Sequence, residues 1–563
     1  MSTPGRFLGA VKSMKLLELL SLEDNKLKLR LMVSGVLSGL GSAALLGLVN
    51  TAAQEISDNG LDRVNWVLAG SFAGITLVYF FAEVFLLSTI GRQIESGIDR
   101  IRQRLFAQIA LADFVKLEAI GQERLFKNIT QSTRVISQNS HLIGMCFRSV
   151  MLLIAVMIYV FWISTLAFFL IIGVIGVGIV IYLRMGKRLG EWFGKLGLVE
   201  AEMFKKIADL FRGIKEVRMW SRRSDTLHRS FEEVSAKKAE YGHKAHDLIS
   251  RQMIMGMSAF YILLAVVVFI VPAYSGNMTT ELSKISTAIL FMIGPIAVMV
   301  QSMSVFAQIE GSATRMLELS TELSGIREDI DEEHPKKLPA EFGQITFEAT
   351  TFTYPNRDPR HGFVLGPIDL AVTSGELLFV TGGNGSGKST LIKLLTGLYR
   401  PEGGKIRIDQ IELGVQSIAS YRNLIATVFS DFHLFADLHG VDQIDPEEAN
   451  HWLERFEISH VTAIRDGRFV TTALSSGQRK RLGLITAILE KRPILVLDEW
   501  AADQDPTFRK KFYTDILPDL KKRGMTVIAV THDDHYFEMA DRRIHLENGK
   551  LSEVTLDDPR GRI

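Results

Sequence analysis

The residues with the clearest chemistry form a glycine-rich loop, TGGNGSGKST, at positions 381–390. Its spacing is that of a Walker A loop, G-x-x-x-x-G-K-[ST]. In such a loop backbone N–H groups face a polyphosphate, the lysine reaches the β- and γ-phosphates, and the hydroxyl after it holds Mg²⁺. The residues expected at the phosphates are Gly382, Asn384, Gly385, Ser386, Gly387, Lys388, Ser389 and Thr390, with Ser389 also on the metal. We therefore expect a nucleoside triphosphate to bind here with Mg²⁺.

The segments that flank this loop have the patterns that it needs. Residues 376–381 are short and apolar, as in a buried strand, and residues 390–397 have helical spacing that ends at a glycine. A simple glycine-rich turn is the alternative, and it would not require this strand and helix. The context favours the phosphate-binding interpretation.

Three later motifs complete the chemistry. Residues 494–498 are an apolar strand that ends at Asp498, a predicted Mg²⁺ ligand, and Glu499 follows in position to polarise a water molecule. Residues 474–478 (LSSGQ) precede a basic helix and predict a second helix N-terminus that binds phosphate. Residues 527–532 are a third buried strand, which ends at His532.

Composition indicates a membrane protein. The 563 residues are 47% hydrophobic, and the net charge of +1 argues against a bulk nucleic-acid binder. A bilayer takes about 20 apolar residues. Six segments reach that length, at 30–50, 64–90, 142–163, 165–183, 252–273 and 285–309.

The charges of the connectors predict the orientation. Connectors 91–140 and 184–251 are long and basic, whereas those between the other spans are short and carry few Lys or Arg. The positive-inside rule therefore places both long connectors and both termini in the cytoplasm. Polar turns are expected at 113–123 and 212–223, where the membrane domain could touch a cytoplasmic one. Residues 6–20 are basic and amphipathic, which favours a helix along the inner membrane surface over a plain soluble helix.

These patterns divide the chain into a membrane domain at 1–325, a charged, proline-containing linker at 326–342, and a nucleotide-binding domain at 343–563. Strand-like alternation at 344–354 precedes the Walker A loop, as in a mixed sheet with helices on its faces. The predicted fold class is an α-helical six-span membrane domain fused to an α/β P-loop domain.

The order and spacing of these motifs resemble the ATP-binding cassette transporters. With six preceding spans the resemblance covers nearly the whole chain, and it is closest to half-size exporters of the type I exporter-like (type IV) fold. It implies an ATPase that works as a homodimer in the bacterial inner membrane. By position, Tyr354 corresponds to the residue that stacks on adenine, Asp505 to the D-loop aspartate and His532 to the switch residue near the γ-phosphate. The signature residues Ser475, Ser476, Gly477 and Gln478 would complete the ATP site of the partner copy.

The run WAADQDP at 500–506 narrows the resemblance to bacterial exporters of cyclic or modified peptides, including peptide siderophores. Export of such a substrate from the cytoplasm is the leading hypothesis, and export of drugs or lipids is the alternative. An ATP-gated channel is a third possibility, but a gate can dispense with the hydrolytic residues Glu499 and His532. Membrane lipid and the exported molecule are the other expected partners, and no nucleic acid is expected.

Three departures from the family pattern stand out. Ser430 occupies the position of a glutamine that usually couples the ATP site to the membrane domain, and Ser476 replaces a glycine. The segment between Ser430 and Leu474 is short and lacks the usual TEVGE stretch. Because a serine cannot reach both a Mg²⁺-bound water and the membrane domain, Asp431 or a water molecule is expected to bridge them.

Two charges lie inside apolar spans, Glu83 and Arg148. At a rise of about 1.5 Å per residue, their depths from the outer ends of their spans are similar enough for contact. They could therefore pair inside the helical bundle. The alternative is that each side chain reaches separately to the cytoplasmic interface.

Overall fold

The computed structural model describes residues 25–59, 65–270, 279–330, 336–339, 341–354, 363–441 and 444–554. The predicted amphipathic helix at 6–20 lies outside these residues. The chain forms two compact units. The membrane unit comprises residues 1–110 and 122–325, and the cassette unit comprises residues 111–121 and 326–563.

In its described residues, the membrane unit consists of helices and the short turns that join them. Its long helices are α3 (Asn25–Asn59), α4 (Trp66–Ala110), α8 (Ser140–Ile163), α9 (Thr165–Arg212), α11 (Ser221–Ala265) and α13 (Thr279–Gly325). Shorter ones are α6 (Gln122–Lys127), η1 (Asn128–Ser132), α7 (Thr133–Gln138), α10 (Ile214–Met219) and η2 (Val266–Ile270). Six helical stretches within the described residues are long and apolar enough to cross a bilayer, as predicted. A helix satisfies its own backbone hydrogen bonds, which an apolar surrounding requires.

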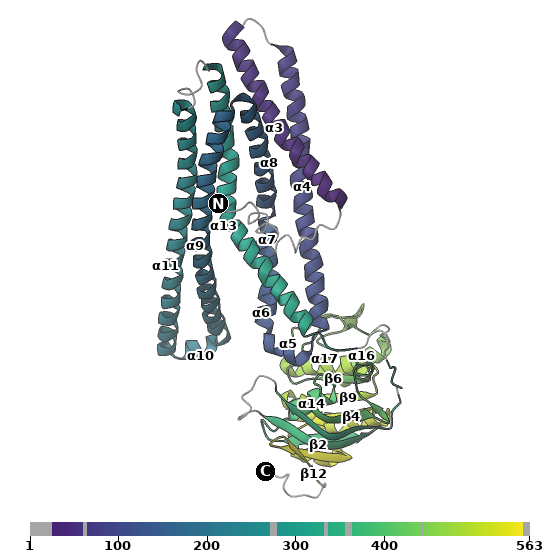
Figure 1. The fold of residues 1–563 in the computed structure, drawn as a ribbon. Helices are drawn as coiled ribbons and strands as arrows, with labels where there is room; N and C mark the ends of the chain where they lie inside the picture. The colour runs from purple at the N-terminus through teal and green to yellow at the C-terminus, as the bar shows by residue number, and fades with distance from the viewer. Residues whose placement is uncertain are drawn as a thin grey trace. The chain divides into compact units, whose positions relative to one another are not determined.

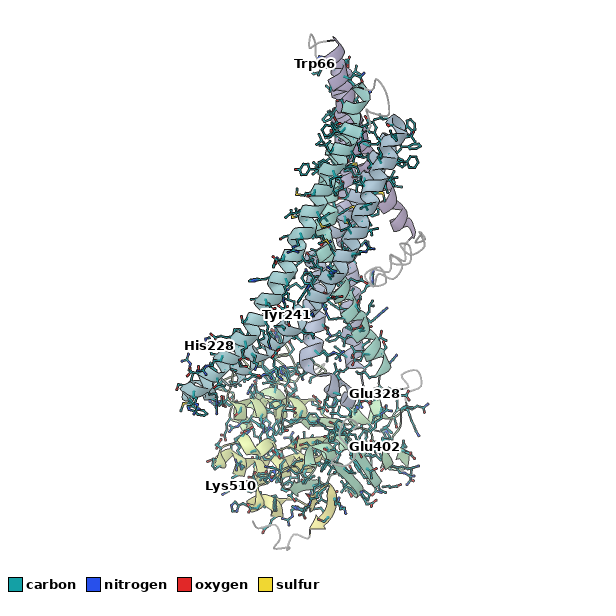
Figure 2. The ribbon with its side chains drawn as sticks, turned by 60° about the vertical axis from the view of Figure 1, so that its left-hand side comes forward. Trp66, His228, Tyr241, Glu328, Glu402 and Lys510 are labelled. Carbon is teal, nitrogen blue, oxygen red and sulfur yellow. The ribbon has the colours of Figure 1, made fainter. Side chains whose placement is uncertain are left out.

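Helices α4, α9 and α11 have 45, 48 and 45 residues, more than twice the length that a bilayer needs. They therefore continue beyond the apolar layer into the long basic connectors. Helices α9 and α11 lie side by side and are joined by α10 at one end (Figure 1). Figure 2 shows Trp66, the first residue of α4, and His228 of α11 at opposite ends of the membrane unit.

Helix α3 packs closely because one face consists of small residues. Ser34, Ser38 and Ser42, spaced by four residues, are all buried. A side chain at Gly39 would place its Cβ 2.9 Å from the backbone oxygen of Met151 in α8. Small residues of this kind allow helix backbones to approach each other within a membrane.

The two intramembrane charges pair. Nε of Arg148 in α8 lies 3.1 Å from Oε1 of Glu83 in α4. Ser38 of α3 donates a hydrogen bond to the other carboxylate oxygen at 2.6 Å. This polar cluster therefore joins three helices, and the hypothesis that the two side chains reach separately to the interface is wrong.

The cassette unit contains two main sheets. Their strands are β1 (Gln344–Thr353), β2 (Val364–Thr373), β3 (Leu377–Gly382), β4 (Gly403–Ile408), β5 (Ile411–Glu412), β6 (Ile425–Val428), β9 (Ile494–Asp498), β10 (Thr526–Val530), β11 (Arg542–Glu547) and β12 (Lys550–Val554). The central sheet has the order β12-β11-β3-β10-β9-β6, and all of its strands are parallel except β12. The other sheet, β2-β1-β4-β5, is antiparallel.

Helices cover the central sheet, as predicted for an α/β P-loop domain. The helices of this unit are α5 (Phe114–Ile120), α14 (Lys388–Leu395), α15 (Ile418–Arg422), α16 (Pro446–Arg455), α17 (Ser476–Leu489), η3 (Trp500–Asp503), α18 (Pro506–Lys511), η4 (Phe512–Ile516), α19 (Leu517–Lys522) and η5 (Asp534–Met539). Two short strands, β7 (Ile464–Arg465) and β8 (Arg468–Phe469), form a separate hairpin. Alternate residues of β3, β9 and β10 belong to two different cores. Phe379, Leu497 and Ala529 pack with α16 to α19, whereas their neighbours Val380 and Val496 pack with α14 and the antiparallel sheet. Both faces of the strands are thus buried, which explains their continuous apolar sequences.

Residues 111–121 belong to the cassette unit although they interrupt the membrane unit in sequence. The main chain of Asp113 donates to Ile326 O at 2.8 Å, and that of Glu328 donates to Leu111 O at 2.8 Å. Glu328, labelled in Figure 2, accepts two hydrogen bonds from Arg422. In α5, Glu118 accepts hydrogen bonds from Tyr399 at 2.6 Å and Lys393 at 2.8 Å. One of the two predicted polar turns therefore packs on the ATP-binding fold.

Candidate nucleotide site

The Walker A loop lies between strand β3 and helix α14. Three of its glycines, Gly382, Gly385 and Gly387, have backbone conformations that residues with a side chain rarely adopt. Gly382 has a φ of 147°, and a Cβ there would lie 2.3 Å from Leu546 O. Gly387 has a φ of 106°, and its Cβ would lie 2.6 Å from the Phe363 ring. The loop thus needs glycine at these positions to turn from the buried strand into the helix.

Two side chains of the loop fit a phosphate-binding role. Lys388 is buried and donates to the main-chain oxygens of Gly382 at 3.1 Å and Gly383 at 3.0 Å. Ser386 Oγ is also buried and has no hydrogen-bond partner among the residues that the structure describes. A buried hydroxyl without a partner is costly, and a phosphate oxygen would satisfy it.

Parallel pairing of β9 and β10 brings the later motifs to the same edge of the sheet. Asp498 is the last residue of β9 and is paired with Val530, the last residue of β10. Glu499 follows β9 and His532 lies two residues beyond β10, so the two residues are close together. Oε1 of Glu499 is 3.2 Å from Nε2 of the histidine. Lys388 Nζ is 3.7 Å from the same oxygen. A cation, a carboxylate and an imidazole thus meet beyond the carboxyl ends of the strands, where ligands bind in open α/β sheets.

Asp498 fits a Mg²⁺ ligand. It is buried, and burial raises the pKa of this carboxyl group, while a hydrogen bond from Ser430 Oγ at 3.1 Å opposes that rise. A divalent cation would compensate the buried negative charge. The described residues contain no group of three His, Cys, Asp or Glu side chains that could hold a metal alone. Few protein ligands are usual for Mg²⁺, which is generally held by one or two carboxylates, waters and substrate phosphates.

The signature residues begin helix α17. Ser475 is its N-cap, and Ser475 and Gln478 form a capping box in which each side chain accepts from the other residue's main-chain N–H. Ser476 and Gly477 are the first residues of the helix. In the described part of the chain, no hydrogen bond or ion pair joins residues 475–478 to the Walker A loop.

Tyr354 and Asp505 lie at element ends. Tyr354 follows β1, and its hydroxyl is 3.1 Å from Thr390 Oγ1 in α14. Asp505 is the N-cap of α18 and accepts from Phe508 N at 2.9 Å and from Arg481 at 2.7 Å. The first of these hydrogen bonds is the main reason that the pKa of Asp505 lies below its usual value. The adenine and D-loop roles of these two residues remain predictions.

The sequence motifs do not identify Lys480, the second residue of the basic run after the signature, as part of the site. Its ammonium group is buried and donates to the main-chain oxygen of Glu499 at 3.0 Å. A lysine two residues beyond the signature was visible in the sequence, but its partner was not.

Comparison with known proteins agrees with this geometry. Residues 365–502 match the family model described as ABC transporter. The chain is 32% identical over 545 residues to the ATP-binding protein SyrD of Pseudomonas syringae pv. syringae, covering 92% of each chain. The chain belongs to the ABC transporter family.

A lipid flippase and a solved exporter structure are also similar to this chain over most of its length. An ATP-dependent lipid A-core flippase of Haemophilus influenzae is 25% identical over 564 residues, covering 93% of this chain and 91% of the flippase. The solved structure of a bacterial Atm1-family ABC exporter has a TM-score of 0.76 at 17% identity and covers 94% of this chain and 95% of its own. The transporter thus has the exporter fold and is a multi-pass membrane ATPase that couples ATP hydrolysis to export, as predicted.

Proposed function

We propose that this transporter is a homodimer that exports a cyclic or modified peptide, such as a peptide siderophore, across the bacterial inner membrane. The observation that carries the catalytic part is the meeting of Lys388, Glu499 and His532 at one edge of the central sheet. The same edge carries the Walker A loop, so the triphosphate and the candidate base share one site.

Each residue of this site has a distinct role in the proposal. The loop from Gly382 to Thr390 binds the phosphates of ATP, and Tyr354 stacks on the adenine. Ser389 and Asp498 would hold Mg²⁺, which neutralises charge on the phosphates. Glu499 acts as the general base that orients the attacking water, and His532, 3.2 Å from it, contacts the γ-phosphate. Residues 475–478 and Asp505 act on the ATP bound by the partner copy.

Helix α5 supports a route by which ATP binding reaches the membrane. Its Glu118 is bonded to Lys393 in α14, the helix that begins at the Walker A loop, and to Tyr399. A change at the loop therefore acts on a segment that continues directly into α4 and α6. Closure of two cassettes on ATP and their release after hydrolysis would alternate the access of the membrane domain.

The peptide substrate rests on the resemblance of residues 500–506 to peptide exporters. The full-length similarity to a lipid A-core flippase favours a lipid as the second candidate. The proposed cytoplasmic position of both termini follows from the connector charges, and the proposed domain boundaries at 325 and 343 follow from the linker composition. The inner membrane is implied by the resemblance to bacterial exporters.

ATPase measurements in lipid nanodiscs test the substrate class. Purified transporter is given a panel of cyclic lipopeptides, peptide siderophores, drugs and lipids. We expect a saturable, several-fold stimulation by one of the cyclic or modified peptides and none by the drugs. Stimulation by lipids alone would favour the flippase alternative and reject the peptide proposal.

A further inference from the structure

Glu499 has an unusual main-chain conformation. Its φ and ψ are 50° and 38°, in the left-handed region that residues other than glycine seldom adopt. Such a conformation persists only where the surroundings fix it. Its N–H donates to Val530 O in the neighbouring strand at 3.2 Å. For this conformation to be fixed at both of its peptide groups, the C=O of Glu499 must be held as well.

Lys480 of α17 holds that carbonyl group. Its Nζ donates to Glu499 O at 3.0 Å, and an ion pair with Asp503 at 2.8 Å compensates its charge. The Lys480 side chain is 7% exposed, so its ammonium group has little water to bond instead. The carbonyl also accepts a longer hydrogen bond from Ala502 N, at 3.4 Å, within η3. With N–H and C=O both held, the direction in which the Cα–Cβ bond of Glu499 leaves the main chain is fixed, and the carboxylate at its end lies 3.2 Å from His532 Nε2.

Trp500 holds the same lysine from the other side. Its indole Nε1–H donates to the main-chain oxygen of Lys480 at 2.8 Å. The ring is 1% exposed and packs against Phe512 with centroids 4.3 Å apart. Lys480 and the Glu499–Trp500 pair thus exchange two hydrogen bonds, one in each direction.

The remainder of residues 500–505 follows the first turn of α17 closely. Gln504 donates to Gly477 O at 3.2 Å and accepts from Arg481 at 2.8 Å. A side chain at Gly477 would place its Cβ 2.7 Å from Asp503 O. Residues 500–505 are therefore complementary in shape and in hydrogen bonding to the signature helix of the same chain.

We propose that Lys480 is a positioning residue that, together with Trp500, aims the Glu499 carboxylate from the signature helix. The inference rests on the proposed role of Glu499 as the base. It assigns a function to the tryptophan after the catalytic glutamate: a change in the first turn of the signature helix is transmitted through Lys480 to the catalytic carboxylate of the same chain.

Replacement of Lys480 tests this inference in the full-length transporter in nanodiscs. In Lys480→Met we expect kcat for ATP to fall roughly tenfold to 100-fold, as for misplacement of a catalytic group by about 1 Å, with KM within twofold of wild type. Trp500→Phe, which keeps an aromatic ring and loses the N–H, should also lower kcat. Because the two residues act as one unit, kcat of the double variant should be no lower than kcat of the less active single variant. Lys405→Met, at an exposed ion pair on the antiparallel sheet, is the matched charge control and should leave kcat unchanged.

Repeating Lys480→Met in a Glu499→Gln background separates positioning from a general structural effect. If Lys480 acts through the carboxylate, the residual turnover of Glu499→Gln, followed by release of labelled phosphate, should not fall further. An equal fold loss in both backgrounds, or wild-type kcat in both Lys480→Met and Trp500→Phe, would overturn the inference alone. Near wild-type turnover of Glu499→Gln itself would instead overturn the assigned base, and the inference with it.

Discussion

At the scale of single residues, Ser430 shows how this transporter departs from its family. Its hydroxyl donates to Asp498 and lowers the pKa of that carboxyl group against the effect of burial. Asp498 must be ionised to hold Mg²⁺. In Ser430→Ala its pKa should rise further, so the acid limb of the ATPase pH profile should move to higher pH.

The measurement is kcat/KM for ATP between about pH 5 and 9 at saturating Mg²⁺. We expect activity to be lost at a higher pH in the variant and to approach wild type in the alkaline range. Ser552→Ala, at an exposed serine of β12, is the control. An acid limb that does not move would show that the Ser430 hydrogen bond does not tune this carboxylate.

Site residues that lie together in one continuous segment could be predicted from their spacing, whereas contacts between separate helices and strands could not. The Walker A loop and the pair Asp498–Glu499 lie in continuous segments, so their spacing alone indicated their chemistry. The contact of Ser430 with Asp498 depends on how β6 pairs with β9. The bond from Lys480 to Glu499 depends on how α17 packs on η3, which no local pattern encodes.

At the scale of elements, the pair Glu83–Arg148 with Ser38 joins α3, α4 and α8. Removal of one charge leaves the other unpaired among apolar helices, whereas removal of both does not. In a double-mutant cycle with Glu83→Gln and Arg148→Gln, we expect a coupling of about 1–3 kcal/mol in the free energy of unfolding. Thermal unfolding and substrate-stimulated ATPase in nanodiscs are the readouts.

The exposed pair Lys238–Glu200, which joins α11 to α9, is the matched control. Its coupling should be no more than about 1 kcal/mol, as for other exposed ion pairs. Additive effects of the two intramembrane substitutions would mean that the pair contributes no net stability.

The number of membrane spans was predictable from hydropathy because the bilayer sets a minimum apolar length. A polar turn was predicted at 113–123, and the structure has a break in the membrane unit at residues 111–121. Its membership in the cassette unit arises from Phe114 and Val115 packing on that core, and a hydropathy pattern cannot assign apolar side chains of a short helix to one unit or the other.

At the scale of the whole molecule, a homodimer with shared ATP sites predicts a specific trapped state. Glu499→Gln keeps the shape of the side chain and removes the base, so ATP should bind and not be hydrolysed. We expect turnover to fall at least about 100-fold. Cross-linking or light scattering should detect closed cassette dimers with ATP, and Lys388→Ala should abolish them. ATP-bound Glu499→Gln that remained open would contradict the shared-site dimer.

The proposed function requires that hydrolysis at Glu499 drives export of a modified peptide. Its most direct test is the uptake of the labelled cyclic lipopeptide or siderophore that best stimulates the ATPase into inside-out vesicles containing the purified transporter. Wild type should accumulate the probe only with ATP and Mg²⁺, and Glu499→Gln should bind ATP and accumulate none. Uptake by Glu499→Gln at the wild-type rate, or ATP hydrolysis by wild type without uptake of any peptide probe, would contradict it.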